Sequence, residues 1–211
     1  MTDTLAKTLQ KACRHLRRCD SRLAQLMKHV GPCTLVPGSD PFPSLARAIV
    51  AQMISTKVAK VISERLETAL SPRGLTPAAV KKASEEKLRG VGLSRNKVLA
   101  LKDLAERSIN GQLPLDRLAE FDDEDAIASL TAVRGIGRWT AEMFLIFSLG
   151  RLDVLPVDDF GLRAGVRDLY QLSELPGRAA LRSQGETWRP YRSIATWYFW
   201  RGRGWVPQSE E

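Results

Sequence analysis

The sequence contains few of the residues that bind metals or form covalent cross-links: three cysteines and two histidines among 211 residues. The cysteines, Cys13, Cys19 and Cys33, are odd in number and lie near the N-terminus, which favours reduced thiols in a cytosolic protein. Cys13 and Cys19 lack a second closely spaced pair, and His15 is the one imidazole between them. We therefore expect no zinc site.

Long apolar runs are also missing. No stretch is long enough to cross a bilayer, and the first twenty residues lack the apolar core of a signal peptide. We expect a protein of the cytoplasm, or of the nucleus in a eukaryote, without a membrane partner. Lysine is absent after Lys102, and every later basic residue is an arginine, which binds phosphate and stacks on aromatic rings better than lysine does.

The charge balance is strongly basic: 32 Lys and Arg against 24 Asp and Glu, a net charge of +8. A surplus of this size favours a polyanionic partner, with nucleic acid first and an anionic membrane surface second. Charge alone does not decide between such a partner and simple solubility.

Helical periodicity dominates, and no alternating pattern is long enough for a convincing strand, so we expect an all-α fold. Gly31-Pro32 should end a first helical run, Ser44 should cap the next helix, and Ser71-Pro72 and Gly111 should end two later ones. Four acids open a further helix, and we expect them to satisfy its first amides rather than to bind a metal: Asp122, Asp123, Glu124 and Asp125. The expected helical segments are 5–30, 45–55, 55–70, 76–84, 84–92, 94–111 and 121–133, with Thr76 and Ser84 as the caps of the fourth and fifth.

A glycine-rich turn interrupts the helical pattern in the stretch "LTAVRGIGRWTAEMFLIF". We expect Gly135 and Gly137 to adopt backbone conformations that other residues avoid, and to keep side chains off the turn. Amides of the turn and of the next helix then form an anion site that suits a DNA phosphate. Arg134 and Arg138 flank it. By itself, G-x-G also fits an ordinary turn between helices.

This stretch, followed by "LPVDD", resembles the signature of the helix-hairpin-helix (HhH-GPD) base-excision DNA glycosylases: a hairpin, a Gly/Pro-rich loop and an essential aspartate. The resemblance runs from about Pro41 to Arg203. "DPFPSLARAIVAQMIS" is similar to the family's early helix and wedge segment. "LRGVGLSRNKVLALKDLA" and "WRPYRSIATWYFWRGRGW" are similar to its 3-methyladenine DNA glycosylase II branch.

The resemblance implies an all-α, two-lobed fold without an N-terminal β domain. It places a central helical bundle at 41–151, with the hairpin at about 130–148, and a second lobe at 1–40 plus 152–211. The active-site cleft is expected between the lobes. The implied activity is hydrolysis of the N-glycosidic bond of alkylated bases, mainly 3-methyladenine, in double-stranded DNA by a monomer.

The register of the family motif selects Asp159 as the catalytic residue, because it is the second acid of the pair and lies twenty positions after Trp139. Alignment to the oxidised-purine branch would select Asp158 instead. We expect Asp158 to be a helix N-cap or an electrostatic neighbour of the substrate pocket. A carboxylate suits the positive charge that develops on the sugar as the base departs.

Other site residues are implied by the same resemblance. The base pocket comprises Trp139, Trp200 and Met143, the last standing where a relative has tyrosine. Met53 is the wedge that fills the gap left by a flipped base, although a buried core methionine is an equal alternative. Gln52 faces the orphaned base. The expected DNA contacts are Gln52, Met53, Arg134, Gly135, Ile136, Gly137 and Arg138.

Bifunctional relatives carry a Schiff-base lysine at the position of Trp139, so we expect no lyase activity here. No cysteine follows Cys33, so we expect no iron–sulfur cluster. The hairpin could hold a monovalent cation (Na⁺ or K⁺) on the carbonyls of Thr131, Val133 and Ile136, and no other cofactor is required. Two rival functions remain: a non-catalytic helix-hairpin-helix DNA-binding module, and a metal-dependent nuclease that uses the acidic cluster.

Overall fold

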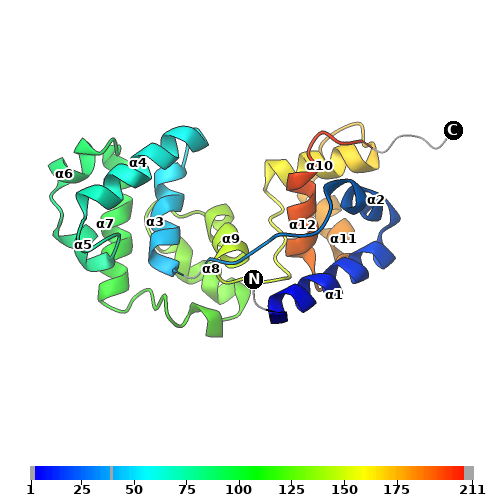
Figure 1. Cartoon of the computed structure of the whole chain (residues 1–211), viewed down its shortest axis with the longest axis horizontal. Coiled ribbons are helices and arrows are strands. Elements are labelled where there is room, and N and C mark those ends of the chain that lie inside the picture. The colour runs from blue at the N-terminus through cyan, green and yellow to red at the C-terminus, as the bar shows by residue number, and fades with distance from the viewer. Residues whose placement is uncertain (1–2, 39, 207–211) are drawn as a thin grey trace. The chain divides into compact units, whose positions relative to one another are not determined.

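The structure is a computed structural model that describes residues 3–38 and 40–206. Over these residues every regular element is helical and no β-strand occurs (Figure 1). The all-α fold expected from the sequence is therefore confirmed. Within the same residues no helix is both long and apolar enough to span a membrane.

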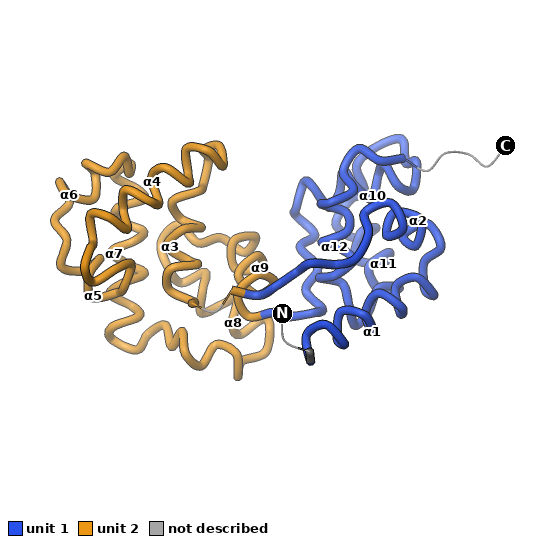
Figure 2. Tube along the Cα trace, viewed as in Figure 1, with its two compact units in different colours: residues 1–37, 150–211 blue, residues 38–149 orange. Residues whose placement is uncertain are grey.

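The chain divides into two compact units (Figure 2). Unit 2 is the continuous segment 38–149, and unit 1 combines 1–37 with 150–211. The divisions expected at 41 and 151 lie within a few residues of these bounds. One unit is thus inserted into the other, so unit 1 is built from both ends of the chain.

Unit 2 is centred on α3, which packs against α4, α7 and α9. Its buried side chains include Leu45 and Ile49 of α3 and Leu101 of α7, each with no exposed area. The elements are α3 (Pro41–Ala51), α4 (Thr56–Ala69), α5 (Pro77–Lys82), α6 (Glu85–Gly90), α7 (Arg95–Ile109), the 3₁₀ turn η1 (Leu118–Glu120), α8 (Asp123–Thr131) and α9 (Arg138–Phe147).

Unit 1 is centred on α12, which packs against α1, α2 and α10. Tyr198 and Phe199 of α12 are fully buried and Trp197 is nearly so, so these three aromatics belong to the core of unit 1. The elements are α1 (Asp3–Cys19), α2 (Ser21–Val30), α10 (Phe160–Tyr170), α11 (Arg178–Glu186) and α12 (Arg192–Arg201).

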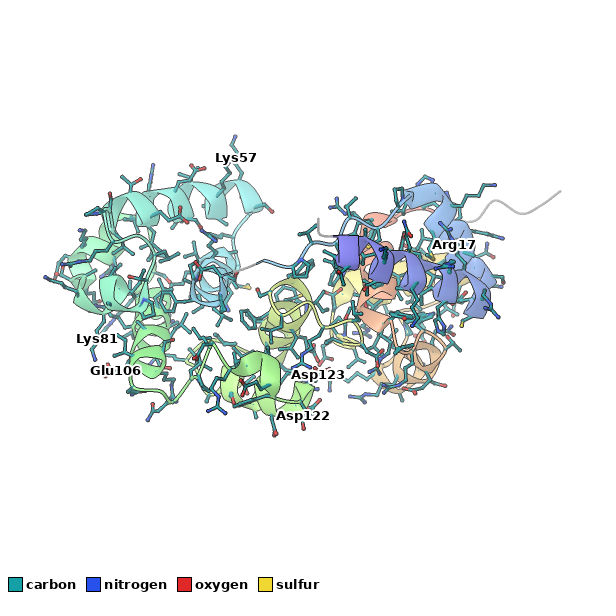
Figure 3. All side chains as sticks on the ribbon, turned by 60° about the horizontal axis from the view of Figure 1, so that its bottom comes forward. Arg17, Lys57, Lys81, Glu106, Asp122 and Asp123 are labelled. Atoms are coloured by element: carbon teal, nitrogen blue, oxygen red, sulfur yellow. The ribbon has the colours of Figure 1, made fainter. Side chains whose placement is uncertain are left out.

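Several helix starts follow the capping residues read from the sequence. The side chains of Thr76, Ser84 and Asp122 accept hydrogen bonds from the third residue after each, as N-caps do. Asp122 and Asp123 stand at the start of α8 (Figure 3). Asp122 thus caps α8, and Glu124 of the same acidic cluster pairs with Arg138.

Three helix boundaries were predicted wrongly, and one is the C-terminus of α3, which ends at Ala51 and not at residue 55. The first helical run is not continuous, because Asp20 leaves helical geometry and caps α2 by accepting from the Leu23 amide at 2.9 Å. Ser44 does not cap α3. That helix begins at Pro41 after an extended Asp40, and the Ser44 hydroxyl donates back to the Asp40 carbonyl at 2.8 Å. Proline at the first helical position explains the earlier start.

Candidate active site and DNA-binding hairpin

The hairpin between α8 and α9 contains two glycines that serve different purposes. Gly135 has φ +77°, and an added Cβ would lie 3.4 Å from the Ala100 side chain. Gly137 has φ −89°, which any residue adopts, and an added Cβ would meet open space. The prediction that both need forbidden backbone conformations is therefore wrong for Gly137. Its missing side chain instead leaves the amides at the start of α9 open to an approaching anion.

The two arginines beside the turn are held differently. The backbone amide of Arg134 donates to Asp103 Oδ2 at 2.7 Å, and its side chain is exposed. The guanidinium of Arg138 donates to Glu124 at 2.8 Å and to the buried Glu142 at 3.0 Å. The hydrogen bond to Glu124 raises the pKa of Arg138 further above its ordinary value. Arg138 therefore stabilises the hairpin, and its DNA contact stays a prediction.

The carbonyls expected to hold a cation belong to Thr131, Val133 and Ile136. The Val133 oxygen accepts the Ile136 amide at 3.1 Å, which uses one of its two lone pairs. The second lone pair of the Val133 oxygen is not used by that hydrogen bond. The cation itself stays a prediction.

Met53 follows the C-terminus of α3 and is the most unusual residue of unit 2. Its φ is +59°, a left-handed conformation that is rare for residues other than glycine. Its relative exposure is 101%, so the whole side chain projects from the surface. The alternative of a buried core methionine is wrong. A strained backbone that holds an apolar side chain out in water suggests a functional use.

Trp139 and Met143 lie four residues apart and therefore on one face of α9. Trp139 is 47% exposed, and Met143 lines a hollow of about 300 Å³ between α3 and α9. Phe147, 40% exposed, continues the same stripe by another four residues. Unit 2 thus presents an apolar, partly aromatic face beside the hairpin.

Asp159 carries the most constrained carboxylate of the predicted site. Its Oδ1 accepts from the Leu162 amide at 2.6 Å and from Trp200 Nε1 at 2.7 Å, and the residue is 8% exposed. Asp159 is therefore the N-cap of α10. The expectation that Asp158 might be the cap is wrong: Asp158 is exposed and pairs with the Arg178 guanidinium. The two adjacent acids are thus clearly different in environment.

Gly161 is a residue that sequence reasoning missed. A Cβ at this position would lie 3.0 Å from Trp200 Cδ1 and 3.1 Å from Asp159 Oδ1, closer than real Cβ atoms normally approach. Glycine therefore lets the indole reach the carboxylate. The available signal was a glycine inside the first turn of a helix, where it is costly without a packing reason.

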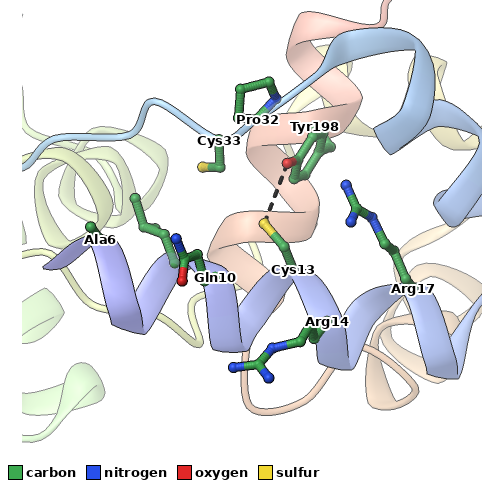
Figure 4. A pocket seen from close by; sticks show the side chains of 9 residues that line it. Ala6, Gln10, Cys13, Arg14, Arg17, Pro32, Cys33 and Tyr198 are labelled. Carbon is green, nitrogen blue, oxygen red and sulfur yellow. Dashed lines mark hydrogen bonds between the residues drawn. The ribbon is translucent and has the colours of Figure 1, made fainter. Parts of the chain in front are cut away.

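Unit 1 also contains a hollow of about 490 Å³, which is lined chiefly by α1. Asp159 does not line it. Figure 4 shows Cys13 and Cys33 at this hollow, with the Cys13 thiol 3.3 Å from the Tyr198 hydroxyl. Burial raises the pKa of the Cys33 thiol to about 11. All three cysteines are free thiols, in keeping with the expected reduced state.

Comparison of the sequence with known protein families identifies the family of this chain. Residues 46–190 match the family model described as "HhH-GPD superfamily base excision DNA repair protein". This match covers well over half of the chain, so the protein belongs to the HhH-GPD superfamily of base-excision DNA repair proteins.

Relatives within the superfamily are more specific. The chain is 36% identical over 205 residues to DNA-3-methyladenine glycosylase 1 of Schizosaccharomyces pombe, covering 94% of this chain and 90% of that protein. A solved S. pombe 3-methyladenine DNA glycosylase in complex with abasic DNA has a TM-score of 0.78 and 36% identity, covering 90% of this chain and 95% of that chain. A DNA-3-methyladenine glycosidase from Bacillus halodurans has a TM-score of 0.82 and 38% identity, covering 90% and 87%.

Proposed function

We propose that the protein is a monofunctional DNA glycosylase. It hydrolyses the N-glycosidic bond of alkylated bases, mainly 3-methyladenine, in double-stranded DNA and leaves an abasic site. The observation that carries this proposal is the Asp159 carboxylate, which is nearly buried and held by both the α10 amide and the Trp200 indole. We further propose that the enzyme acts as a monomer in the cytoplasm, or in the nucleus of a eukaryote.

Departure of the base builds positive charge on the sugar, and a fixed carboxylate stabilises that charge. Because two donors fix Asp159 Oδ1, little reorientation is needed when the charge develops. The same carboxylate can orient or deprotonate the attacking water. An alkylated base already carries positive charge and leaves readily, so a second acidic group to protonate it is less necessary.

The aromatic residues of the site suit a flat cationic base. The family resemblance assigns two indoles, Trp139 and Trp200, to the base pocket, and an indole attracts a cation through its negative π-face. Met143 takes the position of a relative's tyrosine, which loosens the stacking and alters the preference among alkylated bases. Trp139 also takes the position of the Schiff-base lysine, so water is the nucleophile and the DNA backbone stays intact.

The base must leave the helical stack before it can react. Met53 is exposed and apolar, as a side chain that fills the vacated space must be. The amides around Gly137 bind a backbone phosphate without regard to sequence. A monovalent cation on the hairpin carbonyls would strengthen this grip and needs no side chain.

The decisive variant is Asp159→Asn, assayed for release of 3-methyladenine from methylated DNA. We expect base release to be abolished, because the neutral amide cannot stabilise the sugar cation, whereas DNA with an abasic-site mimic is still bound. Asp158→Asn is the matched control, since it removes the neighbouring acid at the exposed Arg178 ion pair. We expect Asp158→Asn to retain most of the activity.

Three results would contradict the proposal. Near-native excision by Asp159→Asn would refute the catalytic assignment. Absence of base release by the intact protein would favour the non-catalytic DNA-binding module. Strand cleavage that is sensitive to a chelator, and that occurs before alkali or heat, would favour the metal-dependent nuclease.

A further inference from the structure

The α3–α4 loop that carries Met53 is tied to the rest of unit 2 from one side by a lysine. Lys97 Nζ on α7 donates to the Val50 carbonyl at 2.7 Å. Val50 lies in the last turn of α3, three residues before Met53. A cation at a helix C-terminus satisfies a carbonyl that lacks an intrahelical partner and interacts favourably with the helix dipole. Lys97 therefore fixes where α3 ends and the exposed loop begins.

The hairpin is tied to the same helix. Asp103 of α7 accepts the Arg134 amide at 2.7 Å, while its carboxylate also pairs with Arg107 at 3.1 Å. Ala100 of α7 lies against Gly135, where an added Cβ would approach it to 3.4 Å. Lys97, Ala100 and Asp103 are spaced three residues apart along α7. One helix thus contacts both the wedge segment and the phosphate-binding turn.

A direct link completes the arrangement. The side-chain amide of Gln52 donates from Nε2 to the Gly135 carbonyl at 2.8 Å, across 83 residues of sequence. Gln52 immediately precedes Met53, which has the left-handed backbone. The hydrogen bond of Gln52 to the hairpin therefore holds the chain directly before Met53. The structure therefore gives Gln52 a partner inside the protein, where sequence analysis expected the orphaned base.

We propose that Lys97, Gln52 and Asp103 are positioning residues that hold the wedge Met53 in fixed register with the phosphate-binding hairpin. The inference rests on the proposed function, in which Met53 fills the gap left by a flipped nucleotide. When the hairpin binds a phosphate, this register directs Met53 to one step of the duplex. The strained backbone of Met53 is retained because Val50 and Gln52, which precede it, are both held by contacts with other parts of unit 2.

The test compares Lys97 with Lys102, a second lysine of α7 that also donates to backbone carbonyls at the end of another helix. Lys102 Nζ donates to the Lys81 carbonyl at 2.8 Å and also to the Ala83 carbonyl, both at the end of α5 and remote in sequence from the wedge. Burial lowers the pKa of both lysines. Lys97→Met and Lys102→Met therefore each remove a partly buried ammonium that binds a helix end. Lys97→Arg restores the charge and the donor.

The readout is the ratio of the affinity for duplex DNA with an abasic-site analogue to the affinity for undamaged duplex. The fluorescence of 2-aminopurine placed beside the gap follows wedge insertion independently. A hydrogen bond from a charged donor corresponds to roughly a 10-fold effect or more, so we expect Lys97→Met to lower the ratio about 10-fold. Lys102→Met should leave both readouts unchanged, and Lys97→Arg should restore most of the loss.

A double-mutant cycle with Met53→Ala separates positioning from general destabilisation. If Lys97 acts through Met53, the combined variant is no worse than Met53→Ala alone, because coupled sites are not additive. Additive losses would overturn the proposal. So would equal effects of Lys97→Met and Lys102→Met, or a wild-type protein without preference for the abasic site. None of these measurements needs base release, so failure of the proposed catalytic function would be seen separately as absent release by the wild type.

Discussion

Gly161→Ala is the variant for which the structure predicts a large loss of catalysis with little change in stability. Alanine is about 1 kcal/mol more favourable than glycine within a helix, so helix propensity alone would stabilise α10. The new Cβ would lie 3.0 Å from Trp200 Cδ1 and 3.1 Å from Asp159 Oδ1. Ordinary contacts lie at about 3.5–4.0 Å, so the indole and the carboxylate must separate by several tenths of an ångström.

The 2.7 Å hydrogen bond from Trp200 Nε1 to Asp159 is the contact that this separation disturbs. Hydrogen bonds to charged groups contribute about 1.5–3 kcal/mol. If the bond orients Asp159 in the transition state, its loss corresponds to a decrease of roughly 10- to 150-fold in the rate of base release. The helix gain offsets part of the steric cost, so we expect the free energy of unfolding to change by less than about 1 kcal/mol.

Single-turnover release of 3-methyladenine from methylated DNA, at saturating protein, measures the chemical step, and thermal unfolding measures the fold. Gly90→Ala is the matched control, because a Cβ there meets no atom within 4 Å and Gly90 ends α6 in unit 2. It should leave base release unchanged. A Gly161→Ala protein that is folded and releases base at the wild-type rate would refute the view that the indole orients Asp159.

Three further predictions concern the hairpin, the core and a thiol. Gly137→Ala should weaken DNA binding and leave the free energy of unfolding nearly unchanged. Gly135→Ala, at φ +77°, should also lower the free energy of unfolding in urea by about 1–2 kcal/mol. Equal losses of stability in the two variants would contradict this prediction. Asp20→Asn weakens the 2.8 Å bond from the Trp188 indole and should cost about 1–3 kcal/mol in the same assay. Burial raises the pKa of Cys33 to about 11 from 9.0, so the free energy of unfolding should fall between about pH 9 and pH 11, because the unfolded thiol ionises first. Dependence on pH below 9 alone would refute that assignment.

Short sequence patterns predicted the start of a helix well where the capping residue lies only three residues before the amide that it accepts from. They failed at Asp20, because Leu16 and Leu23 lie seven residues apart and keep the same buried face on both sides of the break. They also failed to choose the cap among Asp158 and Asp159, because helix boundaries are uncertain by one or two residues and adjacent acids have the same propensity. Register within the family motif, rather than propensity, pointed to Asp159.

The supporting contacts of the site could not be predicted from the sequence. Lys97 and Val50 are 47 residues apart, and Gln52 and Gly135 are 83 apart, so no local periodicity reports these hydrogen bonds. The exposure of Met53 likewise depends on a single positive φ, which tertiary contacts impose on the loop. Sequence reasoning therefore left the wedge and the buried methionine as equal alternatives; the exposure of Met53 overturns the buried methionine, and the wedge stays a proposal.

The insertion of unit 2 into unit 1 has a consequence for synthesis of the protein. The hairpin, the segment that carries Met53 and α7 are all present once residue 149 has been added, whereas unit 1 also needs the 62 residues of 150–211. At roughly 5–20 residues per second, these residues take about 3–12 s to translate. During that interval the nascent chain contains the hairpin but not the Trp200 indole that binds Asp159. Trp200 lies in α12, so the hydrogen bond that fixes Asp159 forms only after both unit 2 and α12 have been synthesised.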